Sequence, residues 1–245
     1  MTFDDDKIRG DDGCSQPRAF PVTHVLFDLD GVIIESESIY EKISADICRE
    51  YGKTYTKDLK SKVMGTPEFE TCRIIVRELN LPLTPEEFLK KYEDKVWIEL
   101  QRPALLPGVK DVVKLLHKHD VPIAIATSSR EPIMKMKTKP HRDLINLFRH
   151  VVCGSSDPEV KNNKPAPDIF LVCASRFPDK PHPSQCLVFE DSPNGVQAAL
   201  NAGMQVVMVP NPDLHPDHPI RSKATQVLES FEHFTPEIFG LPSRF

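Results

Sequence analysis

The sequence predicts a doubly wound α/β fold, in which helices cover both faces of a parallel sheet and a helical domain is inserted after the first strand. Three observations support this prediction. Short, continuously apolar runs recur along the chain, as in strands that are buried on both faces. Helical patterns separate the later runs. One long segment after the first run shows helical periodicity alone.

Five apolar runs are the candidate strands, and they occupy residues 25–27, 121–126, 151–153, 186–189 and 205–209. Amphipathic segments between or before these runs predict helices over residues 109–117, 168–177 and 193–202. Gly203 follows the last of these segments, and glycine commonly ends a helix. Strand and helix therefore alternate through most of the second half of the chain.

The segment between residues 36 and 102 breaks this alternation. Ile39, Ile43 and Ile47 recur at intervals of four, which is typical of one helix face. We expect this segment to form a small bundle of helices. The predicted organisation is a disordered leader at 1–20, an α/β core built from 21–35 and 103–245, and a helical insertion at 36–102.

Composition restricts the possible partners. The 245 residues carry 31 basic and 36 acidic side chains, a net charge of −5, and no basic stripe of the kind that binds a nucleic acid polymer. No apolar run approaches the ~18 residues that span a membrane. The acidic first twenty residues lack the apolar centre of a secretory signal. Six scattered cysteines favour buried thiols in a reducing compartment, so we expect a cytoplasmic monomer or weak dimer.

Polar side chains with possible chemical roles stand directly after predicted strands or before a predicted helix. They are Asp28, Asp30, Thr127, Ser128, Ser129, Lys164, Glu190 and Asp191. Ligands of open α/β sheets bind at the carboxyl ends of the strands. These side chains are therefore expected to meet in one site.

The set suits the transfer of a phosphoryl group. A phosphate monoester is dianionic, so carboxylates can face it when a divalent cation lies between them. Mg²⁺ prefers oxygen ligands of this kind. We predict that Asp28, Asp191 and the backbone carbonyl of Asp30 bind Mg²⁺, with Glu190 contacting the metal directly or through another ligand.

Each residue then has a predicted role. Asp28 is the expected nucleophile, which forms an acyl-phosphate intermediate. Asp30 is the expected general acid toward the leaving oxygen and the base toward water. Thr127 and the following amide, that of Ser128, are expected to hold the phosphoryl oxygens. Lys164 is expected to neutralise charge between the phosphate and Asp28.

Every one of these segments also has an ordinary structural explanation. Asp-x-Asp-Gly is often a turn, and Thr-Ser-Ser is often a loop or a helix cap. An isolated lysine is commonly solvated, and acidic residues are common at the start of a helix. Four such segments in this order, each at a predicted strand end or helix start, favour a functional site.

The order of these segments resembles the four motifs of the haloacid dehalogenase superfamily. The matching segments are residues 27–32, 126–129, 164–168 and 189–195. The resemblance implies the roles given above and a helical cap domain that closes over the substrate. Aspartate two residues after the nucleophile is that superfamily's mark of phosphatases and phosphomutases. We therefore expect Mg²⁺-dependent hydrolysis of a small phosphorylated metabolite.

A closer resemblance, over residues 22–243, is to eukaryotic phosphatases that act on pseudouridine 5′-phosphate. It depends on segments such as 186–191 and 202–210, and it implies that substrate. A sugar- or glycerol-phosphate phosphatase and a β-phosphoglucomutase-like enzyme are alternatives. Tyr40 stands where such mutases have a cap histidine, and Glu68 is near the position of their phosphate-binding arginine, so hydrolysis is favoured.

A catalytically silent binding protein is the remaining alternative. Such a relative would be expected to lack one of the reactive groups, whereas Asp28, Asp30, Lys164 and Asp191 are all present. Substrate choice is expected to depend on the insertion and on the loop after residue 127. The candidate residues there are Ser36, Tyr40, Lys62, Thr66, Glu68, Ser129 and Arg130.

Overall fold

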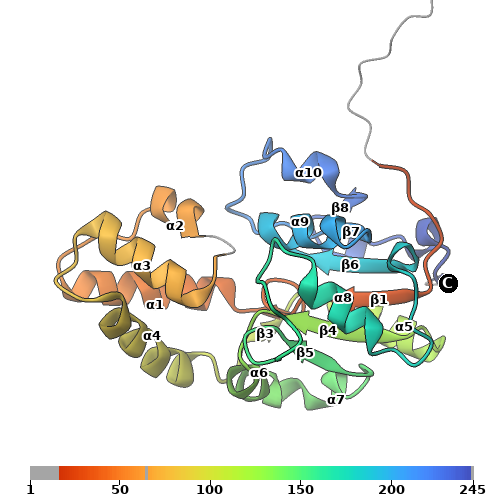
Figure 1. Ribbon diagram of the computed structural model, residues 1–245, viewed down its shortest axis with the longest axis horizontal. Helices are drawn as coiled ribbons and strands as arrows, with labels where there is room; N and C mark the ends of the chain where they lie inside the picture. The colour runs from red at the N-terminus through yellow and green to blue at the C-terminus, as the bar shows by residue number, and fades with distance from the viewer. Residues whose placement is uncertain (1–16, 64–65, 244–245) are drawn as a thin grey trace, which may run out of the picture.

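The computed structural model describes residues 17–63 and 66–243. Its centre is a parallel sheet with the strand order β5-β4-β1-β6-β7-β8 (Figure 1). The strands are β1 (His24–Phe27), β4 (Ile123–Thr127), β5 (Val151–Cys153), β6 (Cys186–Glu190), β7 (Gln205–Met208) and β8 (Gln226–Val227). The chain extends from β1 toward β5 on one side and then from β6 toward β8 on the other. The strand order therefore reverses at β1, where open α/β sheets bind their ligands.

Helices cover both faces of this sheet. One face carries α8 (Asp168–Ser175), α9 (Pro193–Asn201) and α10 (Ile220–Lys223), and the other carries α5 (Val109–Lys118), α6 (Glu131–Thr138) and α7 (Arg142–Ile145). Short 3₁₀ turns complete the core: η1 (Lys139–His141), η2 (Pro183–Gln185), η3 (Phe231–His233) and η4 (Pro236–Phe239). Successive residues of β1 serve opposite faces, since Val25 and Phe27 join one hydrophobic cluster and Leu26 joins the other.

A second, all-helical body stands beside the sheet (Figure 1). It consists of α1 (Glu37–Glu50), α2 (Lys57–Val63), α3 (Glu68–Leu79) and α4 (Pro85–Glu99). These helices have a hydrophobic core of their own, in which Ile43, Ile47 and Phe88 are fully buried. Helix α4 begins with a capping box, in which Thr84 and Glu87 each accept a hydrogen bond from the other's backbone N–H. The predicted fold class, a Rossmann-like core with an inserted helical cap, is confirmed.

Two short strands join the cap to the core. β2 (Ile34–Glu35) and β3 (Ala104–Leu105) pair antiparallel to each other. Lys60 of α2 reaches from the cap to the core, since its ammonium lies 2.5 Å from Glu41 of the cap and 2.5 Å from Asp213 of the core. Ile133 of the core helix α6 packs into the hydrophobic cluster of the cap. These contacts hold the cap over the carboxyl ends of the strands.

The predicted strands and helices of the core lie within two residues of the observed ones, whereas β2, β3, β8 and three further helices of the core have no counterpart in the prediction. Residues 1–16 of the predicted leader lie outside the described residues, and so do Met64 and Gly65. Phe20, at the end of that leader, exchanges two backbone hydrogen bonds with the Gln205 side chain at the start of β7. No helix in the described part of the chain is long and apolar enough to cross a membrane.

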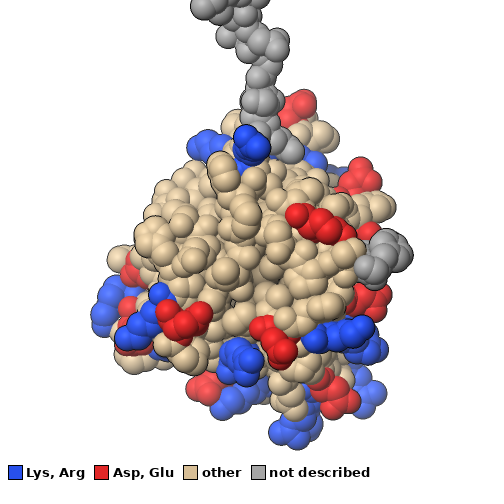
Figure 2. Space-filling model, turned by 90° about the vertical axis from the view of Figure 1, so that its right-hand side faces the viewer, with Lys and Arg blue, Asp and Glu red and all other residues tan. Residues whose placement is uncertain are grey.

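The end of the core that faces away from the cap carries charges of both signs. Figure 2 shows basic and acidic side chains interspersed along the lower edge of this face, around a broad area with few charges. The view shows no continuous basic surface on this face.

Candidate active site

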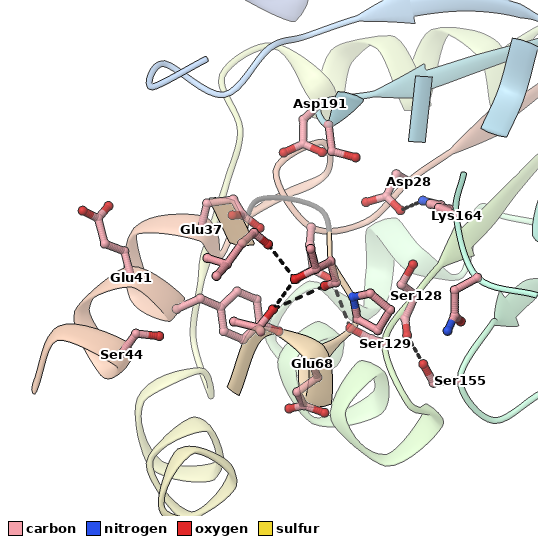
Figure 3. A pocket seen from close by; sticks show the side chains of 18 of the residues that line it. Asp28, Glu37, Glu41, Ser44, Glu68, Ser128, Ser129, Ser155, Lys164 and Asp191 are labelled. Carbon is pink, nitrogen blue, oxygen red and sulfur yellow. Dashed lines mark hydrogen bonds and ion pairs between the residues drawn. The ribbon is translucent and has the colours of Figure 1, made fainter. Parts of the chain in front are cut away.

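The carboxyl ends of β1, β4 and β6 open into a cavity of about 240 Å³ between the core and the cap (Figure 3). Most of the predicted site residues line it: Asp28, Asp30, Tyr40, Thr66, Glu68, Ser128, Ser129, Arg130, Lys164, Glu190 and Asp191. Ser36, Lys62 and Thr127 are not part of the lining. Lys62 contacts Asp58 and Glu78 on the surface of the cap instead.

Asp28 and Lys164 form a buried ion pair. The Lys164 ammonium lies 2.6 Å from the Asp28 carboxylate and 2.5 Å from that of Glu190, and all three side chains are at most 8% exposed. The backbone N–H of Asp28 donates to the carbonyl of Phe189 at 3.0 Å, which fixes the end of β1 beside β6. Lys164 also lies over the ring of Phe170 in α8, 5.0 Å from its centroid.

Negative charge exceeds positive charge around this pair. Burial, together with the charges of Glu190 and Asp30, raises the pKa of Asp28 to about 7, although Lys164 opposes the shift. Burial disfavours the charged form of Lys164, but the charges of Asp28 and Glu190 outweigh it and raise the pKa of Lys164 above its usual value. Lys164 is therefore charged at neutral pH.

Asp191 lies against the loop that follows β1. Gly31 in that loop has a φ of +73°, and a Cβ added there would lie 2.2 Å from the Asp191 carboxylate. Only glycine permits both this turn and this approach without strain. Burial, followed by the charges of Glu190, Glu37 and Asp28, raises the pKa of Asp191 well above its usual value.

Glu190 holds the loop that carries Asp191. One of its carboxylate oxygens accepts hydrogen bonds from the backbone of Asp191 at 2.9 Å, from the backbone of Ser192 at 3.0 Å and from the Ser192 hydroxyl at 3.1 Å. The other accepts from Lys164. A Cβ at Gly195 would lie 1.8 Å from this carboxylate, so α9 can begin here only with glycine at that position. Both oxygens of Glu190 are thus engaged within the protein.

Asp30 is held by a separate set of donors. The Ser36 hydroxyl donates to one carboxylate oxygen at 2.6 Å, and the Ser129 hydroxyl donates to the other at 3.0 Å. Lys137 forms an ion pair with that second oxygen. Burial disfavours the carboxylate, but the charge of Lys137 and these hydrogen bonds outweigh it, so the pKa of Asp30 lies below its usual value. The two aspartates after β1 therefore have opposite pKa shifts.

The loop after β4 lies opposite Asp28. Thr127 is fully buried, and its hydroxyl accepts a hydrogen bond from the backbone N–H of Ser129 at 3.1 Å. Ser128 and Ser129 line the cavity, and the Ser128 carbonyl accepts from the Ser155 hydroxyl at 2.6 Å (Figure 3). Thr127 therefore shapes this loop, and its contact with a phosphate stays a prediction.

The cap supplies aromatic and acidic side chains to the cavity. The rings of Tyr40 and Tyr92 stack with their centroids 6.1 Å apart and 17° between their planes. Arg130 of the core lies 2.5 Å from Glu93 and 3.5 Å from Glu68, both in the cap. Two of the predicted specificity residues, Glu68 and Arg130, therefore meet across the cap–core boundary.

Several charged residues at or near the cavity have no counterpart in the sequence-based prediction, among them Glu37, Glu41, Lys60 and Lys137. Burial, then the charges of Asp30 and Asp28, raises the pKa of Glu37 to about 7. Lys137 is fully buried beside Asp30. A lysine or glutamate in a helix is usually solvated, so no local pattern separates these residues from surface charges. Only the placement of the helices over the sheet edge reveals them.

The acidic side chains fit a bound Mg²⁺. Asp28 and Asp191 are both buried, and the charge of Asp28 contributes to the raised pKa of Asp191, a cost that a nearby cation would relieve. Among residues 17–63 and 66–243, no three His, Cys, Asp or Glu side chains form a metal-binding group by themselves. Mg²⁺ typically binds only one or two carboxylates, and water and phosphate oxygens supply its other ligands. Asp28, Asp191 and a backbone carbonyl are therefore sufficient in number and type as protein ligands for Mg²⁺.

This chain belongs to the haloacid dehalogenase-like hydrolases, whose family model matches residues 25–209. It is 48% identical over 222 residues to "Probable pseudouridine-5′-phosphatase" of Drosophila melanogaster, a match that covers 91% of this chain and 95% of that protein. It is 43% identical over 224 residues to "(DL)-glycerol-3-phosphatase 2" of Arabidopsis thaliana, covering 90% and 92% of the two chains.

A solved structure supports the same assignment. The crystal structure of a haloacid dehalogenase family hydrolase from Deinococcus radiodurans R1, with bound phosphate and sodium, matches this chain with a TM-score of 0.71 and 25% identity. The match covers 91% of this chain and 99% of that one. The family and the curated relatives identify the chain as a phosphatase.

Proposed function

We propose that this phosphatase hydrolyses a phosphomonoester in two steps through a phosphorylated Asp28, with Mg²⁺ as its cofactor. The proposal rests on one observation: the two aspartates at this cavity have different hydrogen-bond and ion-pair partners. Asp28 is paired with Lys164, and Asp30 is held by its own donors. One carboxylate is thus available for attack on phosphorus while the other can move protons.

In the first step an Asp28 carboxylate oxygen forms a bond to phosphorus. The bond between phosphorus and the leaving oxygen breaks. That oxygen keeps the electron pair of the broken bond and receives a proton from Asp30. The negative charge of a bound phosphate raises the pKa of a nearby carboxyl, which favours a protonated Asp30 in the substrate complex. Lys164 and the amides of the Ser128 loop stabilise the charge on the phosphoryl oxygens.

In the second step a water oxygen forms a bond to phosphorus and gives its proton to Asp30. The bond between phosphorus and Asp28 breaks, its electron pair returns to the carboxylate, and inorganic phosphate leaves. Bound Mg²⁺ would be held by Asp28, Asp191 and the Asp30 carbonyl, where it supplies positive charge that lets carboxylates and phosphate share the site. Glu190 supports this set by orienting Asp191.

Mg²⁺ should stabilise the fold through Asp191. The raised pKa of Asp191 means that its charged form costs stability, and this cost grows as the pH rises from its unfolded toward its folded pKa. In EDTA at pH 8, Asp191→Asn should therefore melt at or above the wild-type temperature. Addition of Mg²⁺ should raise the wild-type Tm by several degrees and that of Asp191→Asn by far less.

Differential scanning fluorimetry measures both effects. Asp217→Asn is a matched control, because Asp217 has a side chain that is 91% exposed. It should follow the wild type in both buffers. An equal Mg²⁺-induced shift in Asp191→Asn would place the metal elsewhere.

For the substrate we propose pseudouridine 5′-phosphate. The 48% identical relative carries that phosphatase name, and the stacked Tyr40 and Tyr92 rings offer an apolar surface in the cavity for a base. Glycerol 3-phosphate is the second candidate because a 43% identical relative carries that name. A mutase is disfavoured, since Arg130 is paired with Glu68 and Glu93 and this guanidinium is not available to a second phosphate.

Phosphate release across a panel of monophosphates with Mg²⁺ tests the substrate. The panel contains pseudouridine 5′-phosphate, uridine 5′-phosphate, glycerol 3-phosphate, 2-deoxyglucose 6-phosphate and β-glucose 1-phosphate. We expect the highest kcat/KM for pseudouridine 5′-phosphate and a clear preference over its uridine isomer. Comparable activity on glycerol or sugar phosphates would retain the mechanism and exclude this substrate, and no activity on any of them would favour a binding protein.

The same panel tests the aromatic pair. If the base stacks on these rings, Tyr40→Leu should raise KM for pseudouridine 5′-phosphate roughly tenfold, in line with base–aromatic stacking elsewhere. KM for glycerol 3-phosphate should change little. Tyr51→Leu is the control, because Tyr51 lies in the cap next to Lys91 and does not line the cavity.

We also propose that the protein is a cytoplasmic monomer or weak dimer. All five cysteines in the described residues are buried free thiols, which is usual in a reducing compartment.

A further inference from the structure

Lys137 is an unusual lysine for its position. It lies on α6, and its side chain has no exposed surface, whereas Lys135 on the same helix is 67% exposed and paired with Glu131. Taking an ammonium out of water is costly unless it is paired and hydrogen-bonded. A fully buried lysine that is paired with the active-site residue Asp30 therefore calls for a reason beyond the stability of α6.

The Lys137 ammonium contacts Asp30, the proposed acid/base residue, and two side chains beside it. Its ammonium pairs with one carboxylate oxygen of Asp30 and donates to the Ser129 hydroxyl at 2.7 Å. Ser129 donates to the same Asp30 oxygen, so these three side chains form a closed triangle. The ring of Tyr40 covers the ammonium, with its centroid 5.9 Å away. Ser36 holds the other oxygen of Asp30.

Lys137 is separate from the phosphate-binding lysine. Lys164 forms ion pairs with Asp28 and Glu190, whereas Lys137 forms its ion pair with Asp30. Each of these two buried ammonium groups thus pairs with one of the two aspartates that follow β1. This division matches the two chemical tasks of the proposed reaction, attack on phosphorus and transfer of a proton.

We propose that Lys137 is a positioning residue, which fixes the carboxylate of Asp30 in the orientation that both proton transfers require. The inference rests on the proposed function, in which Asp30 gives a proton to the leaving oxygen and later takes one from water. Lys137 donates hydrogen bonds throughout and is not consumed. Without it only the hydroxyls of Ser36 and Ser129 hold the carboxylate, and a misplacement of about 1 Å can cost on the order of 10²-fold in rate.

The first test is Lys137→Met, which removes the ammonium and keeps a long side chain. We expect kcat to fall on the order of 10²-fold and KM to stay within about threefold, because the substrate-binding groups remain in place. With p-nitrophenyl phosphate, whose leaving group needs no proton, the first turnover should remain fast. The variant should then release a burst of p-nitrophenol equal to the enzyme concentration, followed by slow turnover. Equal slowing of both steps, with no burst, would overturn the proposal.

The second test asks whether Lys137 acts through Asp30. In the Asp30→Asn background, Lys137→Met should change kcat less than about threefold, because the group that it positions is already gone. A further loss on the order of 10²-fold in the double variant would show an independent role and overturn the inference. Failure of Asp30→Asn itself to slow turnover would instead contradict the proposed function, so the two failures are distinguishable.

Two further variants complete the design. Lys135→Met changes the exposed lysine of the same helix and should keep wild-type kcat and KM. If Lys137→Met does not fold, Lys137→Leu also removes the ammonium donor and allows the same two comparisons. Wild-type kcat of the folded variant for both alkyl and p-nitrophenyl phosphates would also overturn the proposal.

Discussion

Replacement of Asp28 by asparagine is expected to reduce phosphate release by about 10⁴-fold or more, as the loss of a nucleophile does in other covalent enzymes. The amide is a poor nucleophile and a weaker metal ligand. The fold should survive, because asparagine has the same shape and Lys164 keeps its contact with Glu190.

Two measurements check this prediction. Steady-state phosphate release gives the loss of turnover. Rapid acid quench followed by mass spectrometry of the intact protein should detect one added phosphoryl group in the wild type and none in Asp28→Asn. Asp58→Asn serves as a control because its side chain is 79% exposed in the cap. Wild-type turnover in Asp28→Asn would eliminate the proposed mechanism.

Replacement of Lys164 by methionine is expected to abolish turnover and also to weaken the fold. The substitution leaves Asp28 and Glu190 buried side by side without a cation. Removal of one partner from a buried ion pair costs about 3–5 kcal/mol. For a chain of this size that corresponds to a Tm lower by on the order of 10 °C.

The pH dependence of this loss follows from the carboxylates. The pKa of Lys164 is raised, so its contribution is present at every pH below its unfolded value and is lost only under strongly alkaline conditions. Its partners behave differently: the pKa of Asp28 is about 7, so this carboxyl becomes neutral as the pH falls below 7. The difference in Tm between the wild type and Lys164→Met should therefore be smaller at pH 5 than at pH 8.

Thermal melts in metal-free buffer at both pH values test this expectation. Lys161→Met is the matched control, since Lys161 lies three residues earlier in the same loop and is exposed. Its Tm should stay close to that of the wild type. An unchanged Tm of Lys164→Met at pH 8 would show that the Asp28–Lys164 pair contributes nothing to stability.

The fold could be predicted from the sequence because the central strands of its sheet are continuously apolar. Residues 25–27 and 186–189 contain no polar side chain, as burial between two layers of helices requires, and both fall within strands of the sheet. By contrast, β8 has only two residues, at the edge of the sheet, and both are partly exposed. Such a strand forms because β7 offers unpaired backbone groups, which the local sequence does not encode.

The residues of the candidate site could be predicted from the sequence only in part. Asp28, Asp30 and Asp191 follow strands directly, so the rule for sheet edges places them together. Lys137 comes from a helix that the prediction lacks and reaches Asp30 from 107 positions away. Its neighbours in sequence, Met136 and Thr138, give no sign of a contact with Asp30. Such a contact depends on tertiary packing and leaves no local signature.

The paired strands β2 and β3 make the helical cap a detachable unit. Both chain segments that leave the core for the cap run side by side, with Ile34 opposite Leu105 and Glu35 opposite Ala104. The strands of the six-stranded sheet all lie outside this insertion. The entropic cost of closing a longer insertion grows only with the logarithm of its length. A different set of cap helices could therefore be grafted between these two strands, which would replace the walls that contact the substrate while leaving the phosphoryl chemistry in place.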